Sequence, residues 1–212
     1  MLLGLRQNIQ LFLRAHLVAF FFMVLFFIIG IVVGALAVKV LPDDQKAELV
    51  SYLHLFFMGL TQGGELTGSE LIFSALANNI KIILLMWILG FTIIGIPFVV
   101  FLIFTRGFIV GFTVGFLVNE YVLRGLAFAF VSVLPHSMFS VPAVIITGVV
   151  ATSFSWMLMR RKVRGRQHIM VEAVSYSFIC FIMALVMVLA SLIEVYISPV
   201  FMKLVARFLV NS

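Results

Sequence analysis

The feature that most constrains this chain is the length of its uncharged apolar segments. Residues 82–105 contain no charged side chain and are bounded by Lys81 and Arg106. A helix rises about 1.5 Å per residue and the hydrocarbon core of a bilayer is about 30 Å thick, so roughly 20 apolar residues suffice to cross it. Because lipid leaves every backbone polar group in need of an internal partner, such segments must be helices or barrel strands. These runs are apolar throughout rather than alternating, which favours helices.

The sequence therefore predicts an all-α, polytopic integral membrane bundle that forms one domain over residues 1–212. Hydrophobic residues make up 64% of the chain and charged residues 10%, and the loops are too short for a separate soluble domain. The net charge of +6 would suggest nucleic acid in a soluble protein, but here the basic residues cluster beside the spans. We expect membrane lipid as a partner and no nucleic acid. About five transmembrane helices are predicted, over residues 17–40, 82–105, 107–123, 137–159 and 173–197.

The charges between the apolar segments predict the orientation. Arg6 and Arg14 precede the first span, whereas residues 42–79 contain five acidic residues and one lysine. Residues 160–166 contain five basic residues, the strongest basic cluster of the chain. Since positively charged flanks stay inside, the N-terminus is expected in the cytoplasm and, after five crossings, the C-terminus outside.

Other segments predict helices at the membrane surface. Apolar residues recur at helical spacing in residues 1–16, which predicts an in-plane cytoplasmic helix, and in residues 199–212, which predicts an outer amphipathic helix. Residues 41–81 are expected to form an extracytoplasmic helical loop, either a docking platform for a partner or helices lying on their own bundle. Residues 125–135 are too short to cross, and we expect a short re-entrant or interfacial outer helix ended by Pro135.

Glycines spaced by four residues predict close helix packing. Gly107, Gly111 and Gly115 leave one face of the expected third span without side chains, and Gly30 and Gly34 do the same in the first span. Lipid gives no hydrophobic drive for helix association, so packing contacts between such small residues matter. The sequence leaves open whether the neighbour belongs to the same chain or to a second copy in a homodimer.

Four polar side chains near the ends of the spans are candidate functional residues: Asn119, Glu120, His136 and Glu194. Ionisable groups in a membrane are costly and therefore functional candidates by default. All four are expected near the outer interface, where water lowers that cost, so a structural or interfacial role competes with proton relay or ion coordination.

No known catalytic pattern is found in the sequence. It has no His-Glu-x-x-His helix, no Gly-x-Ser-x-Gly elbow, no P-loop and no aspartate within an expected span. The single cysteine, Cys180, allows neither an intramolecular disulfide nor a thiolate zinc site. His136 and Ser137 could be imagined as base and nucleophile, but sequence neighbours rarely face each other productively. We expect no enzyme activity, no catalytic residue, no cofactor and no metal.

Several strings carry a resemblance to a known family. They are Trp87-Ile-Leu-Gly90, Ile94-Gly-Ile-Pro97, Arg106-Gly-Phe-Ile-Val-Gly-Phe-Thr-Val-Gly-Phe-Leu-Val-Asn119, Phe130-Val-Ser-Val-Leu-Pro135 and Glu194-Val-Tyr-Ile-Ser-Pro199. Together they resemble the stage II sporulation protein M family of endospore-forming bacteria over nearly the whole chain. In the wider family the segment after the third span is similar to Pro-His-Gly-x-x-Glu-x-Pro-Ala. Here Ser137 replaces the glycine and Ser140 the glutamate, which weakens any His/Glu metal or proton site.

The resemblance implies a role in engulfment during sporulation. Members of the sporulation branch form a complex with stage II sporulation proteins D and P, which are membrane-anchored cell-wall hydrolases. The M component recruits them to the septal membrane, where septal peptidoglycan is thinned and the mother-cell membrane migrates around the forespore. The chain is then expected to be a scaffold in the bacterial cell membrane and not itself a hydrolase.

The alternative function is a transporter or channel component. Pro97, Pro135 and Pro142 interrupt apolar segments, and broken helices of this kind line substrate sites in transporters. Against this interpretation, the sequence has no obvious internal repeat and few polar groups at the centre of its spans.

Overall fold

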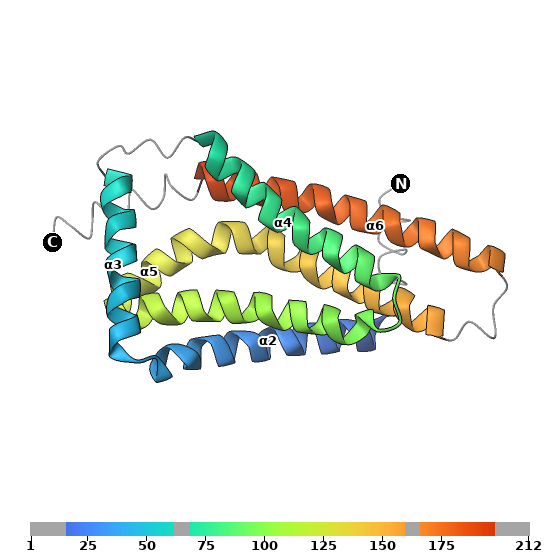
Figure 1. Cartoon of the computed structure of the whole chain (residues 1–212), viewed down its shortest axis with the longest axis horizontal. Coiled ribbons are helices and arrows are strands. Elements are labelled where there is room, and N and C mark those ends of the chain that lie inside the picture. The colour runs from blue at the N-terminus through green and yellow to red at the C-terminus, as the bar shows by residue number, and fades with distance from the viewer. Residues whose placement is uncertain (1–15, 62–67, 160–165, 198–212) are drawn as a thin grey trace, which may run out of the picture.

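The computed structural model describes residues 16–61, 68–159 and 166–197, and in that part the chain is helical without any strand (Figure 1). The elements are α2 (Leu17–Val40), α3 (Asp43–Thr61), α4 (Gly68–Gly90), α5 (Gly95–Met159), α6 (Arg166–Leu192) and the π-helical turn η2 (Ile193–Ile197). The amphipathic helices expected over 1–16 and 199–212 lie, apart from His16, outside the described residues.

Four helical segments are long and apolar enough to cross a membrane, namely Leu17–Val40, Gly95–Glu120, Pro135–Met159 and Ile169–Tyr196. Three of them expose most of their large side chains, as helices surrounded by lipid do, whereas 56% of the Pro135–Met159 window is buried inside the bundle. A fifth crossing would fall to α4, but its apolar part, Leu76–Gly90, is shorter than these spans. The chain is an all-helical, multi-pass membrane protein, and the count of five crossings stays a prediction.

The single span expected over residues 82–105 is interrupted by a turn. Helix α4 ends at Gly90 and α5 begins at Gly95, so the chain reverses inside the uncharged run. Backbone bonds close the turn: the N–H of Thr92 donates to the Leu89 carbonyl at 3.0 Å, and the N–H of Gly95 donates to the Thr92 carbonyl at 3.1 Å. A Cβ at Gly95 would lie 2.6 Å from the Leu89 carbonyl carbon, so only glycine fits there.

Helix α5 doubles back on itself although its backbone is helical throughout. In a straight helix Ile103 and Gly148 would be about 68 Å apart. Instead a Cβ on Gly148 would lie 3.5 Å from Ile103 Cγ1, and the Ser155 hydroxyl bonds the Thr92 carbonyl. Figure 1 shows the two arms side by side and antiparallel. We call Gly95–Glu120 the first arm and Pro135–Met159 the second arm.

These arms change two expected boundaries. The span expected over 107–123 begins twelve residues earlier, at Gly95, because the turn frees residues 95–106 to join it. Residues 125–135 are part of the helical connection between the arms rather than a separate helix, and the helix continues through Pro135. Proline lacks only one helical hydrogen bond and kinks a helix without necessarily ending it. The span expected over 137–159 corresponds to the second arm.

Helix α2 packs in parallel on the first arm through glycines. A Cβ on Gly34 would lie 2.8 Å from the Phe112 nitrogen, and one on Gly111 would lie 2.6 Å from Ile31 Cα. The same close approach pairs Gly30 with Gly107 and Gly115 with Ala35, at 3.2 and 2.9 Å between the added Cβ and the partner Cα. The structure therefore brings the two glycine stripes together within one chain. A homodimer through these glycines would require α2 to leave α5.

An aromatic cluster holds the turn between α4 and α5 in place. The Tyr176 hydroxyl of α6 lies 3.1 Å from the Met86 carbonyl oxygen and 2.9 Å from that of Trp87, in the last turn of α4. Carbonyls at a helix end lack helical partners and need such donors in a membrane. The Tyr176 ring stacks on Phe154 of the second arm, with centroids 4.9 Å apart, and contacts Phe91 of the turn edge-on.

Helix α3 lies across the end of the bundle opposite this turn (Figure 1). It follows α2 directly and makes no extensive packing with another described helix. Its first turn carries Asp43 and Asp44. We call the end of the bundle with α3 the α3 end and the end with residues 91–94 the turn end.

We expect Gly111→Leu to disrupt the packing of α2 on α5. The added side chain would meet the Ile31 backbone, which cannot yield as a side-chain tip would, so a loss of about 3 kcal/mol in unfolding free energy is expected. Thermal unfolding of the purified protein in detergent would measure it. Val32→Leu, on the exposed side of α2, is the matched control and should leave stability unchanged. Equal stability of both variants would contradict the packing role.

Candidate functional site

A polar cluster lies inside the bundle, where four segments that are far apart in the sequence meet. Asn79 comes from α4, Arg106 from the first arm, His136 from the second arm, and Ser191 and Glu194 from the end of α6 and η2. Arg106 stands near the middle of its candidate span rather than at an inner boundary. A cluster of this kind within apolar helices is the part of the molecule that packing alone does not explain.

Asn79 is the hub of the cluster and is almost fully buried. Its amide nitrogen donates to Ser191 Oγ at 2.9 Å and lies 3.3 Å from Glu194 Oε2. Its amide oxygen accepts from a guanidinium nitrogen of Arg106 at 3.0 Å. An amide can donate and accept at once, so this asparagine connects the cation to the carboxylate.

The Arg106 guanidinium is only partly satisfied. Among the described residues it makes no direct ion pair with Glu194, and its Nε is buried without a hydrogen-bond partner. A buried donor without a partner costs about 1–3 kcal/mol, and more when it is charged. The cluster therefore has unused capacity to bind an acceptor.

His136 and Glu194 form the other side of the cluster. His136 Nδ1 lies 3.1 Å from the Ala190 carbonyl oxygen and 3.4 Å from Glu194 Oε2. The carbonyl can only accept, so this bond requires the proton on Nδ1. Glu194 lies in the π-helical turn η2, which changes the direction of side chains relative to a continuing α-helix, and such turns occur frequently at functional sites. Its side chain is 45% exposed, at the α3 end.

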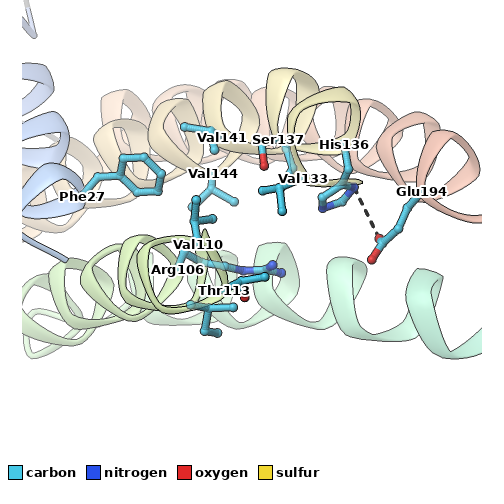
Figure 2. A pocket seen from close by; sticks show the side chains of 12 residues that line it. Phe27, Arg106, Val110, Thr113, Val133, His136, Ser137, Val141, Val144 and Glu194 are labelled. Atoms are coloured by element: carbon cyan, nitrogen blue, oxygen red, sulfur yellow. Dashed lines mark ion pairs between the residues drawn. The ribbon is translucent and has the colours of Figure 1, made fainter. Parts of the chain in front are cut away.

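A cavity of about 200 Å³ adjoins the cluster (Figure 2). Arg106 and Thr113 of the first arm form one wall, and His136 and Ser137 of the second arm lie across from them. Ser140 of the second arm also lines the cavity. In Figure 2 the guanidinium points toward the side where His136 and Glu194 lie. The cavity can therefore offer a guest one guanidinium group, three hydroxyls and an imidazole, beside the carboxylate of Glu194.

Of the four predicted site residues, the structure places two in the polar cluster and two elsewhere. His136 and Glu194 lie together in the cluster. Asn119 and Glu120 lie apart from them, exposed at the α3 end of the first arm, where Asn119 Nδ2 donates to Glu120 Oε1 at 3.2 Å. Ser137 lines the same cavity as His136.

Sequence reasoning missed Asn79, Arg106 and Ser191 as members of the cluster. The sequence places Arg106 at the boundary of a span, because it follows an uncharged run. The signal that corrects this is Gly90 with Gly95-Ile96-Pro97, since glycine and proline together mark a chain reversal. Once the run is divided there, Arg106 falls in the middle of a span. No local signal identifies Asn79 or Ser191.

Within the described ranges, no group of three or more histidine, cysteine, aspartate or glutamate side chains is placed to hold a metal ion. The described cluster combines one cation, one carboxylate, one imidazole and neutral amide and hydroxyl groups. Its chemistry suits hydrogen bonding of a polar group or stabilisation of the helix arrangement.

The fold and the cluster together define a class: a small helical multi-pass membrane protein with a polar cluster inside the bundle. The sequence matches the family model of Stage II sporulation protein M over residues 23–199. The chain belongs to this family, and it is a sporulation-related membrane protein. A search of curated proteins returned no match, and neither did a search of solved structures.

We expect Asn79→Ala to destabilise the protein by about 2–4 kcal/mol, because it removes a hydrogen-bond partner from the buried Ser191, from the partly buried Arg106 and from the half-exposed Glu194. Thermal unfolding in detergent would measure the loss. The same substitution at the exposed Asn119 is the control, with an expected change within about 0.5 kcal/mol. Similar losses at both positions would show that Asn79 is not a hub.

Proposed function

We propose that this chain is a membrane scaffold of the sporulation engulfment machinery. It recruits stage II sporulation proteins D and P to the septal membrane, where these hydrolases thin the septal peptidoglycan and the mother-cell membrane migrates. The family supports the sporulation role. The single observation that carries the scaffold role is α3, a helix that lies across the end of the bundle and packs extensively on no other helix in the described part of the chain.

In the proposed orientation the turn end faces the cytoplasm and the α3 end faces the space between the membranes. The sequence between the end of the second arm at Met159 and the start of α6 at Arg166 is strongly basic, and both of these helix ends lie at the turn end (Figure 1). Acidic side chains gather at the α3 end, among them Asp43, Asp44, Glu120 and Glu194. This distribution supports a cytoplasmic N-terminus and an extracytoplasmic C-terminus, because basic flanks stay inside.

The scaffold is proposed to act through faces that the bundle does not use internally. Its two glycine stripes are occupied by each other, so they are not free for a partner's transmembrane helix. The outward side of α2 exposes large apolar side chains, including Phe21, Phe22 and Ile29. A single-span hydrolase can pack its membrane helix against such a face while its juxtamembrane part meets α3. A homodimer would have to use the same faces.

The chain is proposed to position hydrolases rather than to hydrolyse. In the pair His136 and Ser137, the histidine directs Nδ1 to the Ala190 carbonyl and Glu194.

We expect a Ser137→Ala strain to sporulate as the wild type does, because in this proposal the Ser137 hydroxyl lines the cavity and is not a nucleophile. Spore counts after heat treatment would measure it. A sporulation defect with normal protein level would instead indicate that Ser137 has a chemical role.

Reversing the charge of α3 tests the recruitment itself. Asp44 and Glu48 are exposed in the first turns of α3 and have no packing role there. We expect the double variant Asp44→Lys, Glu48→Lys to reduce co-purification of both hydrolases about tenfold, as loss of favourable rim charges does. Fluorescent fusions should show the hydrolases dispersed from the septum while the variant stays in the membrane.

Glu172→Lys, an exposed charge reversal near the turn end, is the matched control and should recruit normally. Normal recruitment by the α3 variant would remove α3 as the docking element. Absence of both hydrolases from the purified wild-type complex would remove the scaffold function.

The cavity beside Arg106 favours a second candidate function, a transporter or channel component. Broken membrane helices that meet at a polar site occur in transporters. Flux measurements on the reconstituted protein separate the two functions. Solute-specific transport that stops when His136 is altered cannot come from a passive scaffold, whereas a scaffold alone should give no flux above empty vesicles.

A further inference from the structure

The cavity between the arms of α5 is large enough for a small polar guest. Its volume is about 200 Å³, and an apolar cavity of roughly 150 Å³ in another protein accommodates benzene. The walls here are mixed. Six polar side chains line it together with apolar ones, most of them valines. The polar residues are Arg106, Thr113, His136, Ser137, Ser140 and Glu194.

The guanidinium is the strongest unsatisfied group beside this cavity. Asn79 accepts one of its hydrogen bonds, and Nε has no partner among the described residues. The Glu194 oxygen nearest the cluster is already engaged by Asn79 and His136. A guanidinium presents five donors in a planar fork that matches carboxylates and phosphates. An oxyanion in the cavity would satisfy donors that the protein itself leaves open.

The hydroxyls select between these oxyanions. Thr113, Ser137 and Ser140 each add a hydroxyl donor, the first from the first arm and the other two from the second arm. A planar carboxylate has two oxygens, while a tetrahedral phosphate presents oxygens in several directions and can meet donors from both walls. Glu194 also lines the cavity, which favours a singly charged phosphate over one of higher charge.

We propose that the cavity beside Arg106 binds a phosphate group, held by the guanidinium and by the hydroxyls of Ser140 and Thr113. The phosphate comes either from a phospholipid headgroup or from free inorganic phosphate. Ile109 lines the cavity and is 52% exposed on the outside of the bundle, so an acyl-bearing guest has an apolar surface beside the site. This site is independent of partner recruitment.

Binding can be measured on the full chain purified in a phosphate-free maltoside detergent. The probes are inorganic phosphate, followed by isothermal titration calorimetry, and a short-chain phosphatidylglycerol, followed by native mass spectrometry. We expect saturable binding of at least one probe with one site per chain. Binding of the lipid alone identifies a headgroup, and binding of inorganic phosphate alone identifies a soluble ligand.

Two variants act on the site in different ways. Arg106→Gln removes the charge, and Ser140→Val fills the cavity while keeping the guanidinium. Each is expected to weaken binding by about tenfold or more, as loss of a charge-assisted hydrogen bond does. Ser153→Val is the control, because that hydroxyl lies on the same arm but bonds the Val149 carbonyl outside the cavity.

The result that overturns the proposal is the absence of saturable binding of either probe to the wild type, or equal affinity in wild type and Ser140→Val. If Arg106→Gln does not fold, the affinity of Ser140→Val for the probes tests the proposal alone. Valine at position 140 adds only apolar volume next to the guest and keeps the guanidinium. A loss of affinity in Ser153→Val equal to that in Ser140→Val also counts against the site.

Discussion

The arrangement of this protein depends on one chain reversal inside an uncharged segment. In lipid a turn is tolerated only where its backbone groups find partners within the protein. The turn between α4 and α5 meets this requirement with its own bonds, with the Ser155 hydroxyl on the Thr92 carbonyl, and with the Tyr176 hydroxyl on the last carbonyls of α4. Because the turn lies at Gly90–Gly95 and not at Arg106, the first arm begins twelve residues earlier than the sequence predicts, and Arg106 lies inside it.

The earlier start of the first arm explains both its packing on α2 and the position of the polar cluster. The first arm can run parallel to α2 for its full length, so Gly107, Gly111 and Gly115 meet the glycines of α2. It also brings Arg106 to the level of Asn79 of the preceding helix. The glycine stripes make the bundle compact but use up the surfaces that a partner helix could enter, which directs the proposed recruitment to α3 and to the outer side of α2.

The polar cluster connects elements that apolar packing would leave free to slide. Asn79 links the first arm to the end of α6, and His136 links the second arm to the same place. Hydrogen bonds are directional, whereas contacts between apolar surfaces in lipid give little preference among registers. The cluster therefore fixes the register of α6 and η2 at the α3 end, the end where the proposed partners are met, and its unused guanidinium donors provide the phosphate site.

The sequence alone determined the helical class, the membrane setting, the first span at 17–40, the span over 137–159 that corresponds to the second arm, and the two glycine stripes. These follow from the summed free energy of transferring side chains into lipid and from local spacing. It did not determine that Gly90 and Gly95 divide an apolar run, since hydropathy measures how apolar a segment is and not the direction of its backbone. Nor could it assemble Asn79, Arg106, His136 and Glu194, whose separation along the chain carries no signal of contact. Only the tertiary structure decided that these side chains share one site, because their partners lie on other helices and the contact exists only once the turn has set the register.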